Sequence, residues 1–333
     1  MNWLITGGCG FIGTALISAI RAMGGHRVRV LDNLTVGTRE DLRKVAIFEE
    51  LDPDRSILSW DGPDITLVVG DISDSGVAER AAAGADIIVH LAANTGVQPS
   101  IKDPQSDCRV NVLGTLNMLE AARHGRVQRF VFASSGAPLA GNPPPLHEEL
   151  AARPIAPYGA SKLAGEGYCS AYNRTFGVET VVLRFGNVYG PLSKHKSSVV
   201  AKFIKTAISE HVIEIYGDGN QTRDFIYIDD LIDAVYRAAT ISDIGGEVFQ
   251  IASSAECTIN ELANTMIPLL EAALGTKIRV IHAAALPGDA RRNFSDTRKA
   301  QERLGWKPST DRAEGLRKTI SWFYAILEKS KLH

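Results

Sequence analysis

Short apolar runs alternate with amphipathic stretches through the first half of the chain. Strands rich in Val, Ile and Leu are predicted at Asn2–Thr6, Arg27–Leu31, Ile65–Val69, Asp86–Leu91 and Arg129–Ala133. Between them, Gly13–Met23 and Cys108–His124 carry apolar residues at helical spacing. Strands of this composition separated by helices predict an α/β fold, with a doubly wound parallel sheet covered on both faces.

The alternation continues through a helix at Tyr158–Phe176 and a strand at Val178–Arg184, and then loosens after Pro191. Helices are predicted at Val199–Ser209, Asp229–Ala239 and Ile259–Leu274, and shorter strands at Val212–Tyr216, Asp224–Ile228, Glu247–Ile251 and Lys277–His282. We therefore expect a first domain at residues 1–190 and a smaller mixed α/β domain at residues 191–333. Segments such as 224–240 are expected to return to the first domain, and Phe48–Asp64 is interpreted as a surface insertion.

Composition narrows the class of protein. The 333 residues include 36 basic and 38 acidic side chains, and the net charge of -2 argues against a nucleic-acid binder. No apolar run is long enough to span a membrane. The four cysteines are scattered without CxxC spacing, so we expect isolated buried thiols rather than disulfides or a zinc site. Because Met1–Gly13 lacks the features of a signal peptide, a cytoplasmic location is expected.

A glycine-rich turn, Gly7-Gly8-Cys9-Gly10-Phe11-Ile12-Gly13, follows the first strand and opens a helix. Such a turn lets the backbone approach a pyrophosphate, which the N–H groups of the helix N-terminus then bind. Asp32 ends the second strand, where a carboxylate accepts ribose hydroxyls and repels a 2′-phosphate, so NAD is favoured over NADP. Alternatively, Asp32 caps the following turn. Asp71 is placed either to face the adenine or to cap the next helix.

Tyr158 and Lys162 are four positions apart, and therefore lie on one face of the predicted helix. The ammonium could lower the pKa of the phenol and hold the nicotinamide ribose, which would make the phenol a usable proton shuttle. The pair comes just after the strand that ends in Ser134-Ser135. An ordinary helix face is the alternative interpretation.

The ordered motifs TGGCGFIG, VLDNLTVG, GDISD, HLAANTGV, NVLGTLNMLEAA, FVFASS, YGASKLAGE, LRFGNVYGP, YGDGNQTRDFIYIDDL, PGDARRNFSD and LGWKP cover nearly the whole chain. Together they resemble the extended short-chain dehydrogenase/reductase family, in its NAD-dependent nucleotide-sugar epimerase/dehydratase branch. The resemblance implies a Rossmann-type NAD domain, a nucleotide-sugar substrate, and a homodimer formed by the helices Asp107–His124 and Tyr158–Phe176.

The resemblance also implies residue roles. Cofactor contacts would come from Gly7, Gly10, Phe11, Ile12, Gly13, Asp32, Asn33, Asp71, Ile72, Leu91, Ala92, Ala93, Tyr158 and Lys162. Substrate contacts would come from Asn187, Arg223, Arg291, Gly96 and Val97, the two arginines clamping the diphosphate. Alternatively, the arginines are surface ion-pair partners. Asn111 would support the catalytic region, and Gln98 either contacts a sugar carboxylate or is a polar loop residue.

The chain departs from the family pattern at Gly136, where a Ser or Thr hydroxyl is expected. Ser135 is our candidate to supply that hydroxyl, with Ser134 or no residue as the alternatives. Dehydratases of this branch carry an Asp-Glu pair directly afterwards and decarboxylases a nearby Glu, whereas this chain has Ala137 and Pro138, which transfer no proton.

This departure favours a 4-epimerase acting on a UDP-linked hexose, N-acetylhexosamine or uronic acid, because epimerisation needs only one base and a tightly held NAD. The alternatives are a 4,6-dehydratase, a UDP-glucuronate decarboxylase, a 4-keto-sugar reductase, or a weakly catalytic sensor or scaffold that binds NAD and sugar nucleotides.

Overall fold

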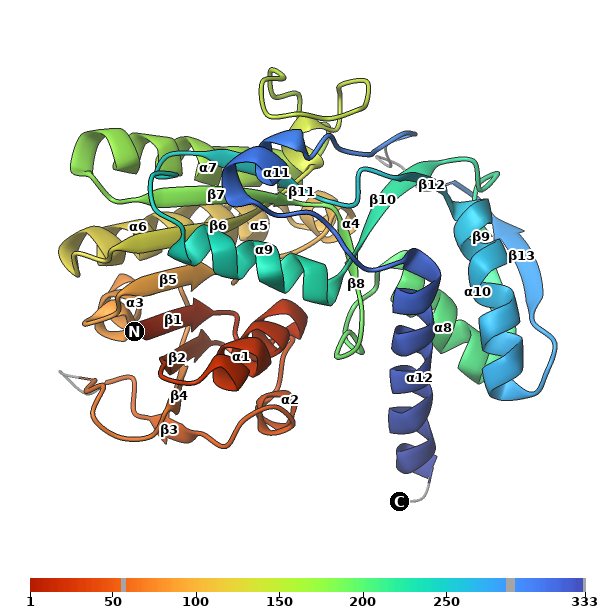
Figure 1. Cartoon of the computed structure of the whole chain (residues 1–333), viewed down its shortest axis with the longest axis horizontal. Helices are drawn as coiled ribbons and strands as arrows, with labels where there is room; N and C mark the ends of the chain where they lie inside the picture. The colour runs from red at the N-terminus through yellow and green to blue at the C-terminus, as the bar shows by residue number, and fades with distance from the viewer. Residues whose placement is uncertain (55–57, 286–290, 332–333) are drawn as a thin grey trace.

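A large sheet of eight parallel strands occupies the centre of the structure (Figure 1). The computed structural model describes residues 1–54, 58–285 and 291–331. The strands are β1 (Asn2–Thr6), β2 (Arg27–Asp32), β3 (Glu49–Leu51), β4 (Ile65–Val69), β5 (Ile87–His90), β6 (Arg129–Ser135), β7 (Thr180–Phe185) and β11 (Val248–Ile251). Their order is β11-β7-β6-β5-β1-β2-β4-β3. The predicted Rossmann-type α/β fold is therefore confirmed, and the order reverses at β1, where such sheets bind ligands.

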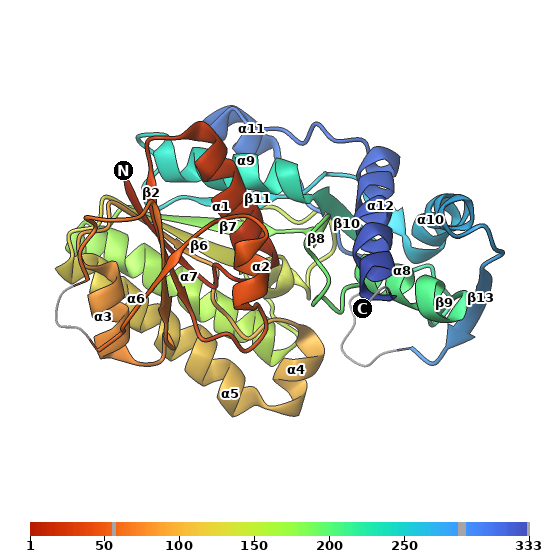
Figure 2. The same cartoon turned by 90° about the horizontal axis from the view of Figure 1, so that it is seen from below.

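Helices cover both faces of this sheet (Figure 2). One face carries α1 (Phe11–Met23), α9 (Ile228–Thr240) and α11 (Arg298–Leu304), and the other carries α3 (Ser75–Ala82), α6 (Gly114–His124) and α7 (Pro157–Phe176). Successive strand side chains point to opposite faces, so Leu4 and Ile5 enter two separate buried clusters. Full burial of such a side chain contributes about 1.5–3 kcal/mol, which explains the nearly continuous apolar strands.

The C-terminal part forms a smaller mixed α/β layer beside the sheet. Its elements are β8 (Asn187–Tyr189), α8 (Val199–Glu210), β9 (Val212–Tyr216), β10 (Thr222–Tyr227), β12 (Glu256–Thr258), α10 (Ile259–Leu274), β13 (Arg279–Ala283) and α12 (Arg312–Lys331). β10 pairs with β8 and β12, and β13 pairs with β9. Two elements that follow residue 190 belong with the large sheet instead: β11 pairs with β7 in it, and α9 packs against its face. The proposed division of the chain at residue 190 stays a prediction.

Several details differ from the sequence expectations. The segment expected as a surface insertion contributes β3, which pairs with the edge of the sheet at β4. The helix expected at Cys108–His124 is divided into α5 (Pro104–Cys108), a wider π-helical turn at Arg109–Leu113, and α6. Cys108 is exposed, unlike the other three cysteines, so the expectation of buried thiols is wrong at that position.

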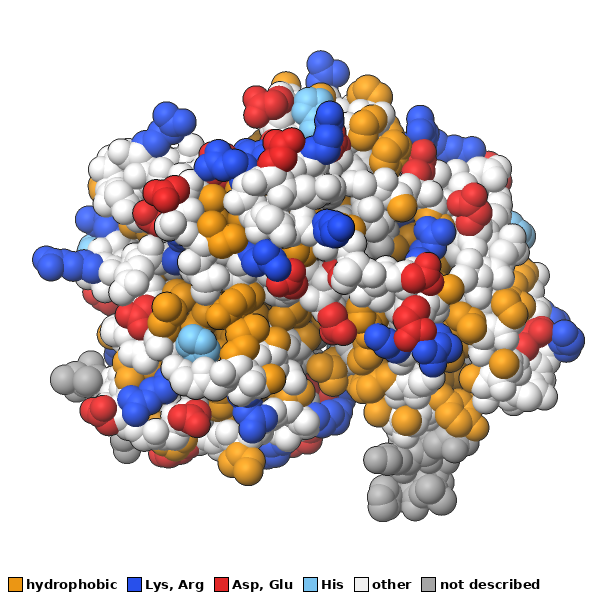
Figure 3. Space-filling model, in the orientation of Figure 1, with side chains coloured by type: hydrophobic (Ala, Val, Ile, Leu, Met, Phe, Trp, Pro, Cys, Tyr) orange, Lys and Arg blue, Asp and Glu red, His pale blue; other side chains and the backbone are white. Residues whose placement is uncertain are grey.

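The surface is mixed in charge on the face drawn in Figure 3, where basic and acidic side chains are interspersed.

Two further short helices, α2 (Arg39–Arg43) and α4 (Val97–Lys102), lie near the carboxyl ends of the strands. No helix within the described residues is long and apolar enough to cross a membrane.

Candidate active site

The glycine turn after β1 is closely packed against the turn after β5. A Cβ on Gly7, whose φ is +67°, would lie 2.9 Å from the backbone nitrogen of Ala92. A Cβ on Gly13 would lie 2.5 Å from Cα of Gly8, inside the same turn. Only glycine fits at these two positions, and α1 begins at Phe11 with its N-terminus at the turn. The chain therefore builds the backbone cradle that a pyrophosphate requires.

The acidic residues that were predicted for the adenosine end lie beside this turn. Asp32 accepts hydrogen bonds from the backbone N–H groups of Cys9 (2.9 Å) and Leu34 (2.8 Å). Burial raises the pKa of Asp32, and these hydrogen bonds act against that rise. Asp32 therefore caps its own turn, as the alternative interpretation has it, and also fixes the glycine turn, while its contact with ribose hydroxyls stays a prediction.

Asp71 lies beside Asn33 rather than at a helix cap. Its carboxylate accepts hydrogen bonds from the Asn33 amide (2.8 Å) and from the Ser73 N–H (2.8 Å). Although burial acts the other way, these hydrogen bonds lower the pKa of Asp71. The alternative that Asp71 caps the next helix is wrong, because Asp74 is the N-cap of α3. Ile72, the next residue, is buried.

The predicted nicotinamide-side residues, Leu91, Ala92 and Ala93, directly follow β5. The N–H of Leu91 donates to the backbone oxygen of Thr6 (3.2 Å), and the N–H of Ala92 donates to the Thr6 hydroxyl (3.1 Å). Since Thr6 ends β1 and precedes the glycine turn, these bonds hold the two predicted cofactor segments side by side.

Two adjacent serines at the end of β6 have different environments. Ser134 is buried, and its hydroxyl donates to Glu166 at 2.5 Å. Ser135 lines the cavity together with Tyr158, and its hydroxyl accepts a hydrogen bond from the N–H of Ala137 (3.2 Å). Burial raises the pKa of Tyr158 to about 12, and the Ser135 side chain acts against this rise. Of the two serines, Ser135 lines the cavity with Tyr158, and its role as the catalytic hydroxyl stays a prediction.

Lys162 lies one turn after Tyr158 on α7. Its ammonium nitrogen donates to the backbone oxygen of Ala133 (2.8 Å) and lies 6.0 Å from the centroid of the Tyr158 ring. Burial lowers the pKa of Lys162 to about 8, against the attraction of the Asp107 and Glu166 carboxylates. The bond to Ala133 therefore holds the ammonium near the end of β6 and near the Tyr158 ring.

Asn111, in the π-helical turn, joins three segments around the phenol. Its amide oxygen accepts from the N–H of Asn94 (2.8 Å). Its amide nitrogen lies within hydrogen-bond distance of the Asn94 oxygen (2.9 Å), Asp107 (3.0 Å) and Ser161 (3.1 Å). Since Ser161 lies between Tyr158 and Lys162, this amide fixes α7 relative to the loop after β5.

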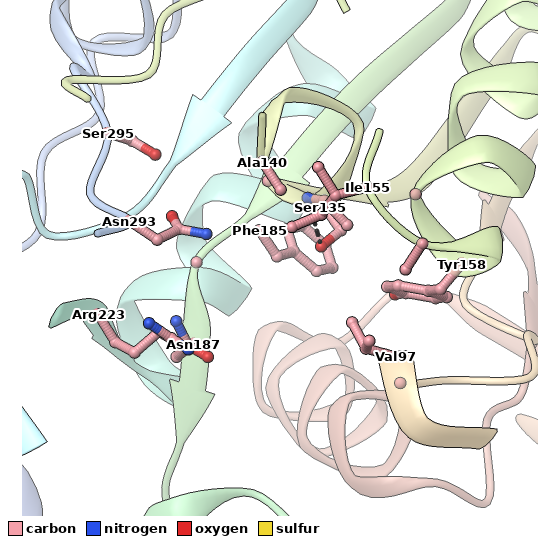
Figure 4. Close-up of a pocket in the computed structure, with 16 residues that line it drawn as sticks. Val97, Ser135, Ala140, Ile155, Tyr158, Phe185, Asn187, Arg223, Asn293 and Ser295 are labelled. Atoms are coloured by element: carbon pink, nitrogen blue, oxygen red, sulfur yellow. Dashed lines mark hydrogen bonds between the residues drawn. The ribbon is translucent and has the colours of Figure 1, made fainter. Parts of the chain in front are cut away.

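A cavity of about 270 Å³ lies beside Tyr158 (Figure 4). Tyr158 and Val97 lie on one side of it, and Asn187, Arg223 and Asn293 on the other. Its lining residues are Gly96, Val97, Ser135, Gly136, Ala137, Ala140, Ile155, Ala156, Tyr158, Gly159, Phe185, Gly186, Asn187, Arg223, Asn293 and Ser295. Among these described lining residues there is no Asp, Glu, His or Cys, and Tyr158 contributes the phenol.

A model of the NAD dependent epimerase/dehydratase family matches residues 3–252. The chain belongs to this family. It is similar to a UDP-glucose 4-epimerase of Mycolicibacterium smegmatis, with 34% identity over 97% of this chain and 98% of the relative. It is also similar to a dTDP-glucose 4,6-dehydratase of Streptomyces niveus, with 32% identity over 97% of this chain and 93% of the relative.

The structure of this family member is similar to that of a UDP-glucose 4-epimerase of Thermus thermophilus in complex with NAD. The TM-score is 0.83 and the identity 32%, over 97% of this chain and 99% of the other. The family is NAD-dependent, and the cofactor of this enzyme is NAD. The glycine cradle and the carboxylate of Asp32 fit that cofactor, because the cradle admits a pyrophosphate and the carboxylate disfavours a 2′-phosphate.

The two arginines that were expected to clamp the diphosphate have separate positions in this epimerase/dehydratase. Arg223, on β10, lines the cavity beside Asn187. Arg291 does not line it; its exposed guanidinium forms two hydrogen bonds with Asp218, at 3.2 and 3.0 Å. This contact lowers the pKa of Asp218 to about 2. Arg291 thus has the surface ion pair that was the alternative interpretation, and residues 287–290 of its motif lie outside the described residues.

Asp224 organises the far wall of the cavity, although no role was predicted for it. It is buried, and its carboxylate accepts hydrogen bonds from the N–H groups of Ser253 (2.7 Å), Ser254 (3.0 Å) and Ser295 (3.2 Å). Because side chains alternate along β10, Asp224 points away from the cavity where Arg223 lines it. The sequence signal available for this structural role was the run Thr222-Arg223-Asp224 at the start of β10.

Proposed function

We propose that this enzyme is an NAD-dependent nucleotide-sugar 4-epimerase, acting on a UDP-linked hexose, N-acetylhexosamine or uronic acid. The observation that carries the proposal is the composition of the cavity, in which Tyr158 is the proton-exchanging side chain among the described lining residues. Epimerisation at C4 returns every proton and hydride that it removes, so one reversible acid–base group suffices. Elimination of water needs a further acid and base, for which carboxylates would be expected.

In this mechanism Tyr158 accepts the proton of the sugar hydroxyl and later returns it. When bound, NAD supplies reversible hydride transfer and a positive charge beside the phenol. Ser135 orients the sugar hydroxyl, since it lines the same cavity as Tyr158. Lys162 holds the cofactor ribose, and Arg223 with Asn187 holds the diphosphate at the opposite wall. The raised pKa of Tyr158 keeps the phenol protonated until positive charge is brought next to it.

The proposal is tested by incubating the purified enzyme with UDP-glucose, UDP-N-acetylglucosamine and UDP-glucuronate, and following the products by NMR. C4 epimers are expected; 4-keto-6-deoxy sugars or pentoses alone would overturn the proposal. Tyr158→Phe should reduce turnover by about 10²–10⁴-fold, the usual contribution of general acid–base catalysis, with NAD content unchanged. Tyr168→Phe, on the exposed side of the same helix, is the matched control and should retain full activity.

We also propose that the enzyme forms a homodimer through α6 and α7. α7 and the turn before α6 leave apolar side chains exposed: Leu113 at 52% and Phe176 at 50%. A four-helix contact between two copies would bury them. Light scattering gives the mass that tests this arrangement.

A further inference from the structure

One carboxylate on α2 joins the cofactor side of the molecule to the loop that follows β8. Asp41 lies 2.7 Å from the ammonium of Lys194 and 2.9 Å from Nε2 of His195. It also contacts the ammonium of Lys44 (3.0 Å) and accepts a hydrogen bond from the hydroxyl of Thr38 (2.8 Å), the residues that cap α2. Although burial acts the other way, these hydrogen bonds hold the pKa of Asp41 well below its usual range. The carboxylate is 13% exposed, so it is largely shielded from water.

Both segments joined by this carboxylate contact the glycine turn that forms the cofactor cradle. Just ahead of α2, a Cβ on Gly37 would clash with the backbone oxygen of Cys9, so the chain passes directly against this turn. In the loop at residues 191–198, which we call the strap, the ammonium of Lys196 lies 5.4 Å from the centroid of the Phe11 ring. Phe11 is the first residue of α1, whose N-terminus completes the cradle. The carboxylate therefore fastens the strap next to the cradle.

The strap begins in a backbone conformation that a leucine adopts only at a cost. Leu192 has φ +70°, in the left-handed region, where its Cβ crowds the backbone. The hydroxyl of Ser193 donates to the backbone oxygen of Gly190 (2.6 Å), which ties the start of the strap to the end of β8. The middle of the strap is tied to α2 through Asp41. Strain at its start favours opening of the strap, and the contacts with Asp41 oppose that opening.

We infer that the strap is a latch for the cofactor, which opens away from the glycine turn before NAD is released and which Asp41 holds closed. Its two cationic side chains, Lys194 and His195, reach the same carboxylate from a segment more than 150 positions later in the chain. The latch slows the exchange of NAD, which suits an enzyme that regenerates its cofactor within each cycle. The inference does not rest on the proposed function, because the NAD dependence belongs to the whole family.

The test measures how fast bound NAD exchanges with an excess of isotope-labelled NAD. The NAD-loaded enzyme is sampled over time, and the protein-bound cofactor is analysed by mass spectrometry. Asp41→Asn keeps the size of the side chain and removes its charge, so exchange should be about 10–100-fold faster, the effect of losing a charge-assisted hydrogen bond. Asp233→Asn removes a carboxylate from an exposed ion pair with Arg237 on α9, and this matched control should exchange NAD at the wild-type rate.

Variants on the strap distinguish a latch from damage to α2. The double variant Lys194→Met/His195→Asn leaves α2 unaltered and should accelerate exchange as much as Asp41→Asn. Adding Asp41→Asn to it should give no further acceleration, because all three changes break one set of contacts. The inference is overturned by a wild-type exchange rate in Asp41→Asn or in the double variant. It is also overturned if the accelerations multiply in the triple variant, since the two sides would then act independently.

Discussion

A buried ion pair fixes the catalytic helix to the sheet, and its removal gives a quantitative test of the structure. Glu166 on α7 receives two hydrogen bonds from Arg184 on β7, at 2.9 and 2.6 Å, and one from Ser134 at 2.5 Å. The two charged side chains are 6% and 7% exposed. Water therefore cannot replace either partner, and Glu166→Gln leaves the guanidinium as an uncompensated buried charge.

The expected loss is about 3–5 kcal/mol in the free energy of unfolding, the usual cost of removing one partner of a buried pair. The double variant Glu166→Leu/Arg184→Met replaces both charges with apolar groups, and should be more stable than Glu166→Gln alone. Glu302→Gln, at an exposed position on α11, is the control and should change stability by less than about 0.5 kcal/mol. Because Ser134 and Ser135 are adjacent, turnover should also fall in Glu166→Gln.

Urea unfolding of the NAD-free protein, followed by circular dichroism, measures these free energies. The reasoning is refuted if Glu166→Gln is within about 1 kcal/mol of wild type, because a surface pair would give that value. It is also refuted if the double variant loses as much as the sum of the losses of Glu166→Leu and Arg184→Met measured singly, since the charges would then not interact.

Two further predictions concern the cofactor side of the site. Gly13→Ala places a Cβ 2.5 Å from Cα of Gly8, so it should weaken NAD binding in a calorimetric titration and destabilise the fold by about 1–3 kcal/mol. Gly167→Ala, in open space on α7, should instead leave NAD affinity unchanged. Burial lowers the pKa of Lys162 from 10.5 to about 8, so the folded state binds fewer protons than the unfolded state between these values. The free energy of unfolding should therefore rise with pH through this window in wild type, and rise less in Lys162→Met; equal slopes in urea titrations would contradict the assigned burial.

Periodicity predicted the parts of the fold that burial determines. β1, β9 and α10 have the bounds expected from their apolar patterns, because each buries a continuous apolar face. β3 was not predicted, since Glu49 and Glu50 give an exposed edge strand no apolar signal. The division of the helix near Cys108 was also not visible, because a π-helical turn keeps nearly the same spacing of apolar residues.

The candidate site could be predicted where one segment contains both the residues and their spacing, as with Tyr158 and Lys162. That the hydroxyl of Ser134 bonds to Glu166 and that of Ser135 lines the cavity could not be predicted, because it depends on a carboxylate distant in the sequence. The position of the Arg291 guanidinium could not be predicted from its motif, because it is determined by a partner distant in the sequence, Asp218. Asn293 lies inside the motif PGDARRNFSD, but no role was predicted for it, because only folding brings this loop residue beside the cavity.

The position of β11 has a consequence for the synthesis of the chain. β7 is buried along its whole length, yet one of its edges is completed only by Val248–Ile251, which are translated much later. Until then, the nascent sheet presents an unpaired apolar edge, which can pair with another chain. A fragment ending at residue 190 would therefore leave that edge permanently open to aggregation.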